Sequence, residues 1–286
     1  MAGYYFVQTE VGLITCRARG RFRQGEAKPL VGDRVRCSLL TDETGVLEEI
    51  LPRQSYLERP LVANVDQVLV MCAAAAPSPN LSLIDRLLVT AEFMQLPAIV
   101  GVNKADLDTE GTGAGLKRLY ENIGYPCFFF SLKQAGGLEE LKRHLSGHVT
   151  VLAGQSGVGK SSLLNTLVAE RVAETGSVSQ RSGTGRHTTK HVELLPLPPP
   201  IDGFLVDTPG FSRLQLPADL QAAQLDQYFP ELRRFAANCR FGSSCAHLQE
   251  PDCAVQEALQ SGLVAQSRMD SYRQLYQELD ERERRY

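Results

Sequence analysis

Gly154-Gln155-Ser156-Gly157-Val158-Gly159-Lys160-Ser161 fits the complete G-x-x-x-x-G-K-S pattern of a phosphate-binding loop. It follows an apolar strand expected over residues 150–153 and precedes a helix expected to begin at Lys160 and to include Ser162. In such a loop, successive backbone N–H groups and the helix N-terminus face phosphate oxygens. We therefore expect Lys160 to reach the β- and γ-phosphates of a nucleotide and Ser161 to bind Mg²⁺.

A second motif, Asn103-Lys104-Ala105-Asp106, follows the expected strand 98–102 and predicts which base is bound. The Asp106 carboxylate can accept two hydrogen bonds from N1–H and the 2-amino group of guanine, whereas adenine lacks this donor pair. A site that reads a hydrogen-bonding group rejects analogues without it by roughly 10⁴–10⁵. We expect Asn103 to support the loop and the purine, and the Lys104 stem to lie along the base plane. This motif disfavours an ATPase or a small-molecule kinase.

Two shorter motifs close two further expected strands. Ser131-Leu132-Lys133 ends the strand expected over 127–131 and would offer a backbone N–H to the base. Asp207-Thr208-Pro209-Gly210 follows the strand expected over 204–206. There Asp207 would hold Mg²⁺ through water, and the Gly210 N–H would contact the γ-phosphate.

The segment 174–191 lies between these phosphate-sensing motifs and has almost no apolar residues, so we expect a mobile loop. Thr189, in preference to Thr188, would complete the Mg²⁺ coordination when γ-phosphate is present. Phe211 stands where many GTPases carry a water-positioning Gln, and Phe cannot orient water by hydrogen bonding. Either His187, whose neutral imidazole can accept a hydrogen bond near pH 7, positions the water, or hydrolysis is slow. The alternative for His187 is a solvent-facing loop residue.

The region around the motifs, residues 61 to about 215, alternates strand and helix candidates, which is typical of a mostly parallel α/β sheet covered by helices. The expected strands are 67–73, 98–102, 127–131, 150–153 and 204–206, and the expected helices are 82–95, 115–123, 138–145 and 160–168. The Pro-rich stretch 196–200 is expected to be a hairpin loop.

Residues 1–60 contain short β-prone pieces at 4–9, 12–19, 33–39 and 45–50, which is typical of a small all-β, OB-like barrel. Every second residue in part of this region is basic: Arg17, Arg19, Arg21 and Arg23. On a strand this spacing places the four side chains on one face. That face is either simply solvated or a contact surface for a nucleic-acid backbone.

Residues 216–286 are expected to be mostly helical, with a cluster of four metal-ligand residue types: Cys239, Cys245, His247 and Cys253. Three thiolates and one imidazole suit a closed, tetrahedral, structural Zn²⁺ site. The alternative is three buried or free thiols. The chain has seven Cys, an odd count that argues against a disulfide framework and favours a reducing compartment.

The bulk properties of the 286 residues limit the possible partners. The formal net charge is −3, so a nucleic-acid partner must be met by a local basic patch. The longest apolar run, residues 68–77, is far shorter than the roughly 20 residues of a membrane span. The N-terminus has no signal-peptide pattern. We therefore expect a cytoplasmic protein without a membrane partner, and a monomer.

The order of the motifs along the chain resembles that of the ribosome small-subunit-dependent GTPase A family, in which the base-reading motif precedes the phosphate-binding loop. The resemblance covers essentially the whole chain. It is carried by Val31-Gly32-Asp33-Arg34-Val35, the loop 154–161, Gly185-Arg186-His187-Thr188-Thr189, the stretch 207–211 and the Cys/His cluster. One departure is that Cys239 and Cys245 are one residue further apart than in the family, with the extra length taken up in 242–244.

The resemblance implies an N-terminal OB-fold (1–60), a circularly permuted GTPase domain (61–215) and a C-terminal zinc domain (216–286). It also implies GTP and GDP binding with Mg²⁺ and Zn²⁺, contacts with rRNA, and late maturation of the small (30S) ribosomal subunit, which would stimulate hydrolysis. Two alternatives stay open: a related permuted GTPase of the large subunit, and a GTP-gated RNA-binding module that does not hydrolyse GTP, which the presence of Phe211 leaves open.

The permutation also suggests a mechanical hypothesis. The γ-phosphate sensor that ends at Gly210 precedes the first expected zinc ligand, Cys239, by about 29 residues. We therefore expect nucleotide state to pass through residues 207–213 to the zinc domain. GTP would favour the ribosome-bound arrangement, and hydrolysis would promote release.

Overall fold

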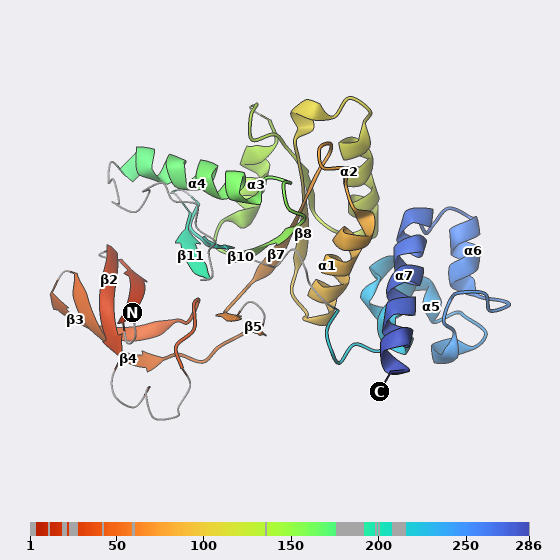
Figure 1. Ribbon diagram of the computed structural model, residues 1–286, viewed down its shortest axis with the longest axis horizontal. Coiled ribbons are helices and arrows are strands. Elements are labelled where there is room, and N and C mark those ends of the chain that lie inside the picture. Colours follow the sequence, from red (N-terminus) through yellow and green to blue (C-terminus); the bar gives the residue numbers. More distant parts are fainter. Residues whose placement is uncertain are drawn as a thin grey trace.

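The computed structural model describes three successive parts: a β-rich part, a central α/β part and a helical part (Figure 1). The described residues are 4–10, 12–18, 22, 28–41, 43–58, 61–134, 136–175, 192–197, 199, 201–207 and 216–285. The expected domain boundaries near residues 60 and 215 stay predictions, because 59–60 and 208–215 lie outside this range.

The central part is built on a six-stranded sheet. In spatial order its strands are β11 (Glu193–Pro196), β12 (Phe204–Asp207), β10 (Val149–Gly154), β7 (Gln67–Ala73), β8 (Ala98–Asn103) and β9 (Cys127–Phe129). All neighbouring pairs are parallel except β11 and β12, which form the expected hairpin. The strands β7 and β8 are buried along their whole length, which explains their continuous apolar sequences.

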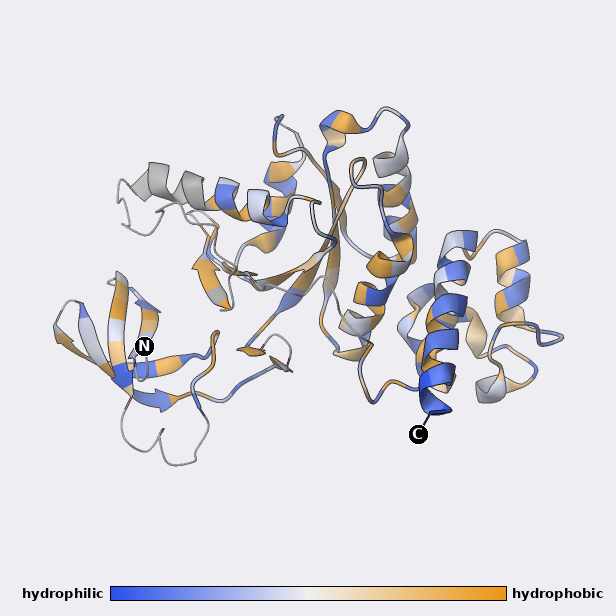
Figure 2. Ribbon diagram, in the orientation of Figure 1, coloured by the Kyte–Doolittle hydropathy of each residue, from blue (hydrophilic) through white to orange (hydrophobic). Residues whose placement is uncertain are grey.

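Helices cover both faces of this sheet, as the alternation of the sequence predicts. They are α1 (Leu81–Phe93), α2 (Thr112–Ile123), α3 (Leu138–Leu145) and α4 (Lys160–Thr175). Side chains of α1 and α2 share one hydrophobic cluster with the sheet, and those of α3 and α4 share another. Figure 2 shows the apolar residues concentrated along the central strands and the helix sides that pack on them.

Some element bounds differ from those expected. The strand expected over 127–131 ends at Phe129, because Ser131 leaves the ladder to contact Asp106. The helix expected over 160–168 continues to Thr175.

The N-terminal part is a four-stranded sheet in the order β1 (Tyr4–Thr9), β2 (Gly12–Ala18), β4 (Thr44–Ile50) and β3 (Val35–Thr41). It encloses a small core of Ile14, Cys16 and Leu47. Because β2 ends at Ala18, only Arg17 of the four regularly spaced arginines lies on a described strand. Arg19, Arg21 and Arg23 lie outside the described residues.

Residues Val31 and Gly32 connect the β-rich part by hydrogen bonds to the hairpin of β5 (Tyr56–Glu58) and β6 (Leu61–Ala63). The Ala63 N–H donates to the Val31 carbonyl at 2.8 Å, and the Asn64 amide donates to the Gly32 carbonyl at 2.9 Å. Gly32 has φ +87°, and a Cβ there would lie 2.1 Å from the Ala63 carbonyl oxygen. Only glycine fits this close approach.

The C-terminal part is mostly helical. It contains the 3₁₀ helices η4 (Ala222–Tyr228) and η5 (Gly242–Ser244) and the α-helices α5 (Pro230–Ala236), α6 (Ala254–Gln260) and α7 (Gln266–Glu283). Its core is a separate hydrophobic cluster that also takes in Val89 of α1. In Figure 1, α7 runs beside α1, so α1 packs on the central sheet and on the helical part at once.

Among the helices that the structure describes, none combines the length and the apolar character needed to cross a membrane.

Candidate functional site

The sheet brings the nucleotide motifs to one edge. Strands β7, β8, β10 and β12 run in the same direction, so their carboxyl ends meet there. The phosphate-binding loop leaves β10 at Gly154, the base-reading motif leaves β8 at Asn103, and β12 ends at Asp207. This is the edge at which open α/β sheets bind ligands.

The phosphate-binding loop begins with a glycine that no other residue could replace. Gly154 has φ +133°, and a Cβ there would lie 2.1 Å from the carbonyl oxygen of Met71 on β7. The Lys160 ammonium lies over the loop and donates to the carbonyls of Gly154 and Gln155 at 2.7 and 2.8 Å. The loop therefore holds its lysine on the inner side of its own turn.

The rest of the loop is anchored at one residue and open at others. The side chain of Val158 is buried in the core between the sheet, α3 and α4. By contrast, Ser156 and Gly157 are exposed, as are Ser161 and Ser162 in the first turn of α4. The backbone N–H groups and the Ser161 hydroxyl are thus available to a phosphate and its cation.

The base-reading motif is hydrogen-bonded directly to the phosphate-binding loop. The Asn103 amide donates to the Val158 carbonyl at 2.9 Å, and Lys104 Nζ donates to the Gly157 carbonyl at 2.8 Å. The contact is tight, since a Cβ on Gly159 would lie 2.3 Å from Asn103 Nδ2. Two motifs about 50 residues apart in the chain therefore form one rigid surface.

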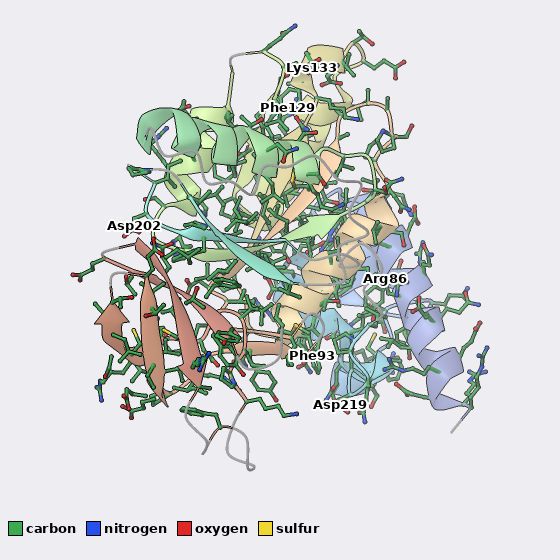
Figure 3. The ribbon with its side chains drawn as sticks, turned by 60° about the vertical axis from the view of Figure 1, so that its left-hand side comes forward. Arg86, Phe93, Phe129, Lys133, Asp202 and Asp219 are labelled. Carbon is green, nitrogen blue, oxygen red and sulfur yellow. The ribbon has the colours of Figure 1, made fainter. Side chains whose placement is uncertain are left out.

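The third motif contacts the second. Ser131 Oγ donates to Asp106 Oδ1 at 2.5 Å and accepts from the backbone N–H of Lys133 at 3.1 Å. The side chain of Leu132 lies 3.6 Å from the Cβ position of Gly159. Figure 3 shows Lys133 near Phe129, at the end of the α/β part remote from the β-rich part. The Asp106 carboxylate is thus oriented by a hydroxyl that the chain supplies.

One segment of this site was not predicted from the sequence. Residues 74–80 connect β7 to α1 and pass over the phosphate-binding loop; we call them the strap. Lys104 Nζ donates to the Ala76 carbonyl, and the ring of Pro77 lies 3.7 Å from the Cβ position of Gly157. The strap ends at Asn80, whose side chain caps α1 by accepting from Leu83 N–H. The sequence signal in this segment is Asn80, an N-cap residue before an apolar helix, but it predicts only where a helix begins and not a contact with the nucleotide motifs.

Several predicted site residues lie outside the part of the chain that the structure describes: His187, Thr188, Thr189, Gly210 and Phe211. For Asp207, the described backbone ends β12 at the same edge as the loop, and the side chain is not described. The roles expected for these residues stay predictions.

The four predicted metal ligands meet in the helical part: Cys239, Cys245, His247 and Cys253. All are buried, and their ligand atoms lie within 4.8 Å of one another. His247 Nδ1 lies 3.5 Å from the sulfurs of Cys239 and Cys253, and the Cys245 and Cys253 sulfurs are 3.7 Å apart. The residues between Cys239 and Cys245 include η5, where we expect the extra residue of this spacing to be accommodated. Three thiols and an imidazole converging on one point have the composition of a closed zinc site.

A neighbouring carboxylate that the sequence did not reveal orients the imidazole. Asp226 Oδ2 lies 3.7 Å from His247 Nε2, on the ring side opposite the sulfurs. Burial lowers the pKa of His247, but Asp226 and Cys239 outweigh it and hold the pKa above its ordinary value. Carboxylate–imidazole pairs of this kind fix the tautomer and the orientation of a metal-ligating His.

The surroundings of Cys239 favour its thiolate. Burial raises the pKa of the Cys239 thiol, but hydrogen bonds from the backbone N–H groups of Val255 and Ala254 and from Cys253 outweigh it, so the pKa is lowered. These N–H groups belong to the start of α6, where the helix dipole also favours negative charge. The cluster therefore suits a cation held by sulfur anions.

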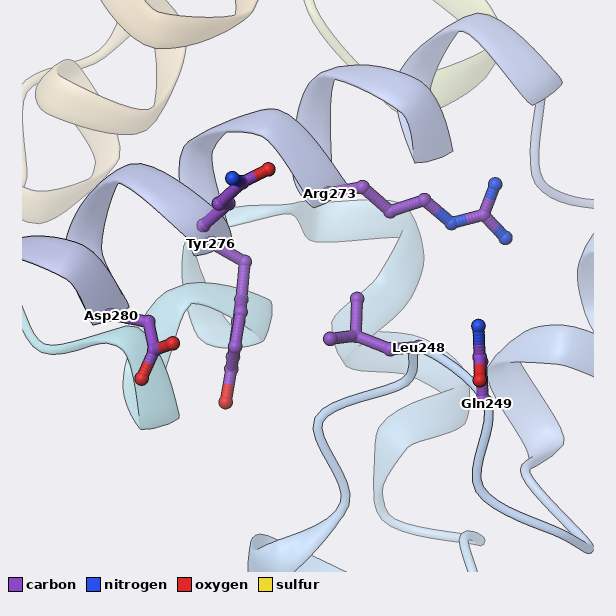
Figure 4. Close-up of a pocket in the computed structure, with 6 residues that line it drawn as sticks. Leu248, Gln249, Arg273, Tyr276 and Asp280 are labelled. Atoms are coloured by element: carbon purple, nitrogen blue, oxygen red, sulfur yellow. The ribbon is translucent and has the colours of Figure 1, made fainter.

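A shallow pocket of about 660 Å³ lies beside this cluster. Figure 4 shows Arg273, Tyr276 and Asp280 projecting from α7 around it, with Leu248 and Gln249 on the facing loop. Its lining comes entirely from the helical part, so it is distinct from the nucleotide edge.

Family models match both the β-rich part and the α/β part. The model described as RsgA GTPase matches residues 50–217, and the model described as RsgA N-terminal domain matches residues 1–47.

Named relatives are similar over the whole chain. A protein of Caldanaerobacter subterraneus subsp. tengcongensis, named small ribosomal subunit biogenesis GTPase RsgA, is 43% identical over 285 residues, covering 100% of this chain and 95% of that protein. A protein of the same name from Alkaliphilus metalliredigens is 42% identical over 288 residues, covering 100% and 97%.

Two solved structures share the fold. The crystal structure of YloQ, described as a circularly permuted GTPase, has a TM-score of 0.78 at 37% identity, covering 99% of this chain and 93% of that one. YjeQ from Thermotoga maritima has a TM-score of 0.78 at 36% identity, covering 96% and 94%. Since the GTPase model spans more than half of the chain and relatives above 40% identity span all of it, the chain belongs to the RsgA family of circularly permuted GTPases.

Proposed function

We propose that this protein binds and hydrolyses GTP and acts in late maturation of the small ribosomal subunit, which stimulates its hydrolysis. The observation that carries the proposal is the direct bonding of the guanine motif to the phosphate-binding loop, from Asn103 to Val158 and from Lys104 to Gly157. This arrangement can read a guanine base and hold its phosphates on one surface. The names of the relatives supply the ribosomal role.

Each nucleotide contact then has a candidate residue. Backbone N–H groups of 154–159 would hold the phosphates, with Lys160 swinging from its carbonyl partners to the β- and γ-phosphates. The Ser161 hydroxyl would bind Mg²⁺, joined by Thr189 and, through water, by Asp207. Bound Mg²⁺ would neutralise charge on the phosphates. Gly210 would sense the γ-phosphate through its N–H.

For hydrolysis, we assign the positioning of the attacking water to His187, since Phe211 has no hydrogen-bonding group. We expect a slow unaided rate, because His187 would have to be placed beside the γ-phosphate before it could align the water. Binding of a small subunit would supply that placement. A GTP-gated module without hydrolysis is the competing function that Phe211 supports.

The outer face of the β-rich part has side chains that are suited to binding RNA. Tyr4 and Phe6 of β1 are exposed, and the guanidinium of Arg17 on β2 lies 4.9 Å over the Tyr4 ring. Exposed aromatic rings beside a cation can stack nucleobases and contact phosphates. We assign this surface, which we call the β1–β2 face, to rRNA. A protein that acts on ribosomal subunits works in the cytoplasm, and we expect it to do so as a monomer.

In the helical part, we assign Zn²⁺ to the cluster of Cys239, Cys245, His247 and Cys253. All four ligands come from the chain, so the ion would be structural rather than catalytic. It would stabilise a domain of about 70 residues, a size at which a hydrophobic core alone rarely supplies more than about 3–5 kcal/mol.

The central test measures GTP turnover alone, with purified small subunits and with purified large subunits. We expect slow turnover alone and a strong increase only with small subunits. Stimulation by large subunits would favour the related large-subunit function, and no turnover under any condition would favour the RNA-binding module.

In the same assay, we expect His187→Ala to lower stimulated turnover by about 10²-fold or more, because a positioned acid or base contributes a factor of about 10²–10⁴ to the rate. Unchanged turnover would remove His187 from its role.

Replacing Asp106 tests how the base is read. Asp106→Asn loses the acceptor pair for guanine, and we expect the affinity for GDP and GTP to fall by about 100-fold, as for two charged hydrogen bonds of about 1.5 kcal/mol each. The matched control is Asp108→Asn, because Asp108 lies two residues later and accepts a hydrogen bond from the Gly113 N–H in the first turn of α2 instead. Titration of a fluorescent GDP analogue would measure both. Equal affinities for the two variants would contradict the assignment.

Metal content tests the cluster. Native mass spectrometry should show one Zn²⁺ per chain, and Cys245→Ser should lose it, because zinc binding and folding of such small sites are coupled. Cys37→Ser is the control, since Cys37 lies in the β-rich part, and should keep the ion. If the native mass of the wild-type protein equals that of the chain without metal, the four residues do not bind zinc.

Removing an aromatic ring tests the β1–β2 face. Phe6→Ala should weaken binding to small subunits by about 5- to 100-fold, since stacking of one base contributes about 1–3 kcal/mol. Leu40→Ala is the control, because Leu40 is an even more exposed apolar residue of the same sheet and has no π-face. Co-sedimentation at low salt would measure both variants. A similar loss for both would point to a protein contact instead of base stacking.

A further inference from the structure

A buried cluster of charges joins the helical part to the GTPase part. Arg268, in the first turn of α7, is fully buried at 0% exposure. Its Nη1 donates to Asp85 Oδ1 on α1 at 2.5 Å, and its Nε and Nη2 donate to the carboxylate of Glu231 on α5 at 2.5 and 3.2 Å. One guanidinium thus bridges carboxylates from both parts of the protein.

A second GTPase helix meets the same carboxylate. The Tyr120 hydroxyl of α2 donates to Asp85 Oδ1 at 2.8 Å. Burial raises the pKa of Tyr120, and Asp85 raises it further, so the phenol keeps its proton as a donor. The Arg268 guanidinium also lies 4.5 Å from the Phe229 ring centre, which adds a cation–π contact from the helical part.

Such a cluster contributes more to fixing how the helices pack than to the free energy of folding. It places two carboxylates and one cation out of water, and Asp85 Oδ2 has no hydrogen-bond partner among the described residues. Burying ions is costly, and loss of any one partner leaves an uncompensated buried charge. Val89 adds an apolar contact in the same interface, which is not directional. We expect the charged cluster, whose contacts depend on direction and distance, to favour a single register of α1 against α7.

The two helices held in this way lead back to the nucleotide edge. Asp85 lies about one turn after Asn80, where the strap ends and α1 begins. The Ala76 carbonyl of the strap accepts a hydrogen bond from Lys104, and the Pro77 ring of the strap lies against the phosphate-binding loop. Helix α2 follows the base-reading motif in the chain. A shift of α1 along α7 would therefore move the strap that touches both nucleotide motifs.

We propose that Arg268 is a positioning residue for the nucleotide site. Through Asp85, it sets the start of α1 and with it the strap over the phosphate-binding loop and Lys104. The inference rests on the proposed guanine-nucleotide site. By linkage, docking of the helical part strengthens nucleotide binding, and nucleotide binding strengthens docking to the same degree.

The test compares two variants that each break a contact between α1 and α7. In Arg268→Lys, the ammonium keeps the charge but cannot bridge the carboxylates of Asp85 and Glu231. We expect its Kd for GDP to rise about three- to tenfold, a size typical of residues that modulate coupling. The KM for GTP in subunit-stimulated turnover should rise by a similar factor, with a smaller change in kcat.

The matched control is Glu278→Gln. Glu278 of α7 accepts from both terminal nitrogens of Arg86, which Figure 3 shows beside α7, so this pair joins the same helices. The side chain of Glu278 is 46% exposed and that of Arg86 is 16% exposed, so this pair is in part open to solvent, whereas the Arg268–Asp85 pair is fully buried. We expect the Kd of Glu278→Gln for GDP to stay within about twofold of wild type, because ion pairs open to solvent contribute little.

Hydrogen exchange on the wild-type protein gives a readout that needs no variant. GDP should slow exchange of amides in the first turns of α7 by about threefold or more. Unchanged exchange in α7, or equal GDP affinity for folded Arg268→Lys and wild type, would overturn the inference while leaving the nucleotide site intact. Failure of the wild-type protein to bind GDP would overturn the inference and the proposed function together.

Discussion

The rest of the structure depends on the parallel pairing of β7 with β10. This pairing places the phosphate-binding loop, which leaves β10, beside the strand that opens the α/β part. The permuted chain reaches β10 late, after the base-reading motif, yet the sheet order puts β10 between β12 and β7. Parallel strands present their carboxyl ends at one edge whatever their order in the chain, so the permutation leaves the nucleotide site intact.

What the permutation changes is the set of neighbours of that site. In chain order, the β-rich part precedes β7, the first strand of the sheet, and the helical part follows β12, its last strand. The hypothesis that nucleotide state passes through 207–213 involves residues mostly outside the described range. The contacts that the structure describes between the GTPase part and the helical part include that of α1 with α7, where Arg268 meets Asp85, and that of α1 with η4. Helix α1 belongs to both hydrophobic cores, so it is the element best placed to link them.

The metal cluster and the charge cluster have a common physical logic. Each gathers polar groups that are costly to bury alone: thiols and an imidazole in one, carboxylates and a guanidinium in the other. Removing one member of either cluster leaves buried polar groups without their partners, so each cluster favours one defined arrangement of the small helical domain. Tyr272 of α7 lies near both, since its hydroxyl donates to the Ala246 carbonyl and its ring packs on Phe229.

By itself, the sequence determined the nucleotide motifs, the alternation of strands and helices, and the four residues of the metal cluster, because each is encoded by spacing within a few residues. Only the tertiary structure decided that Asn103 bonds to Val158, that the strap supports Lys104, that Asp226 orients His247, and that Arg268 bridges Asp85 and Glu231. Arg268 and Asp85 are 183 residues apart. Contacts at such separations depend on how whole helices pack, and an arginine or an aspartate on a helix carries no local pattern that names its distant partner.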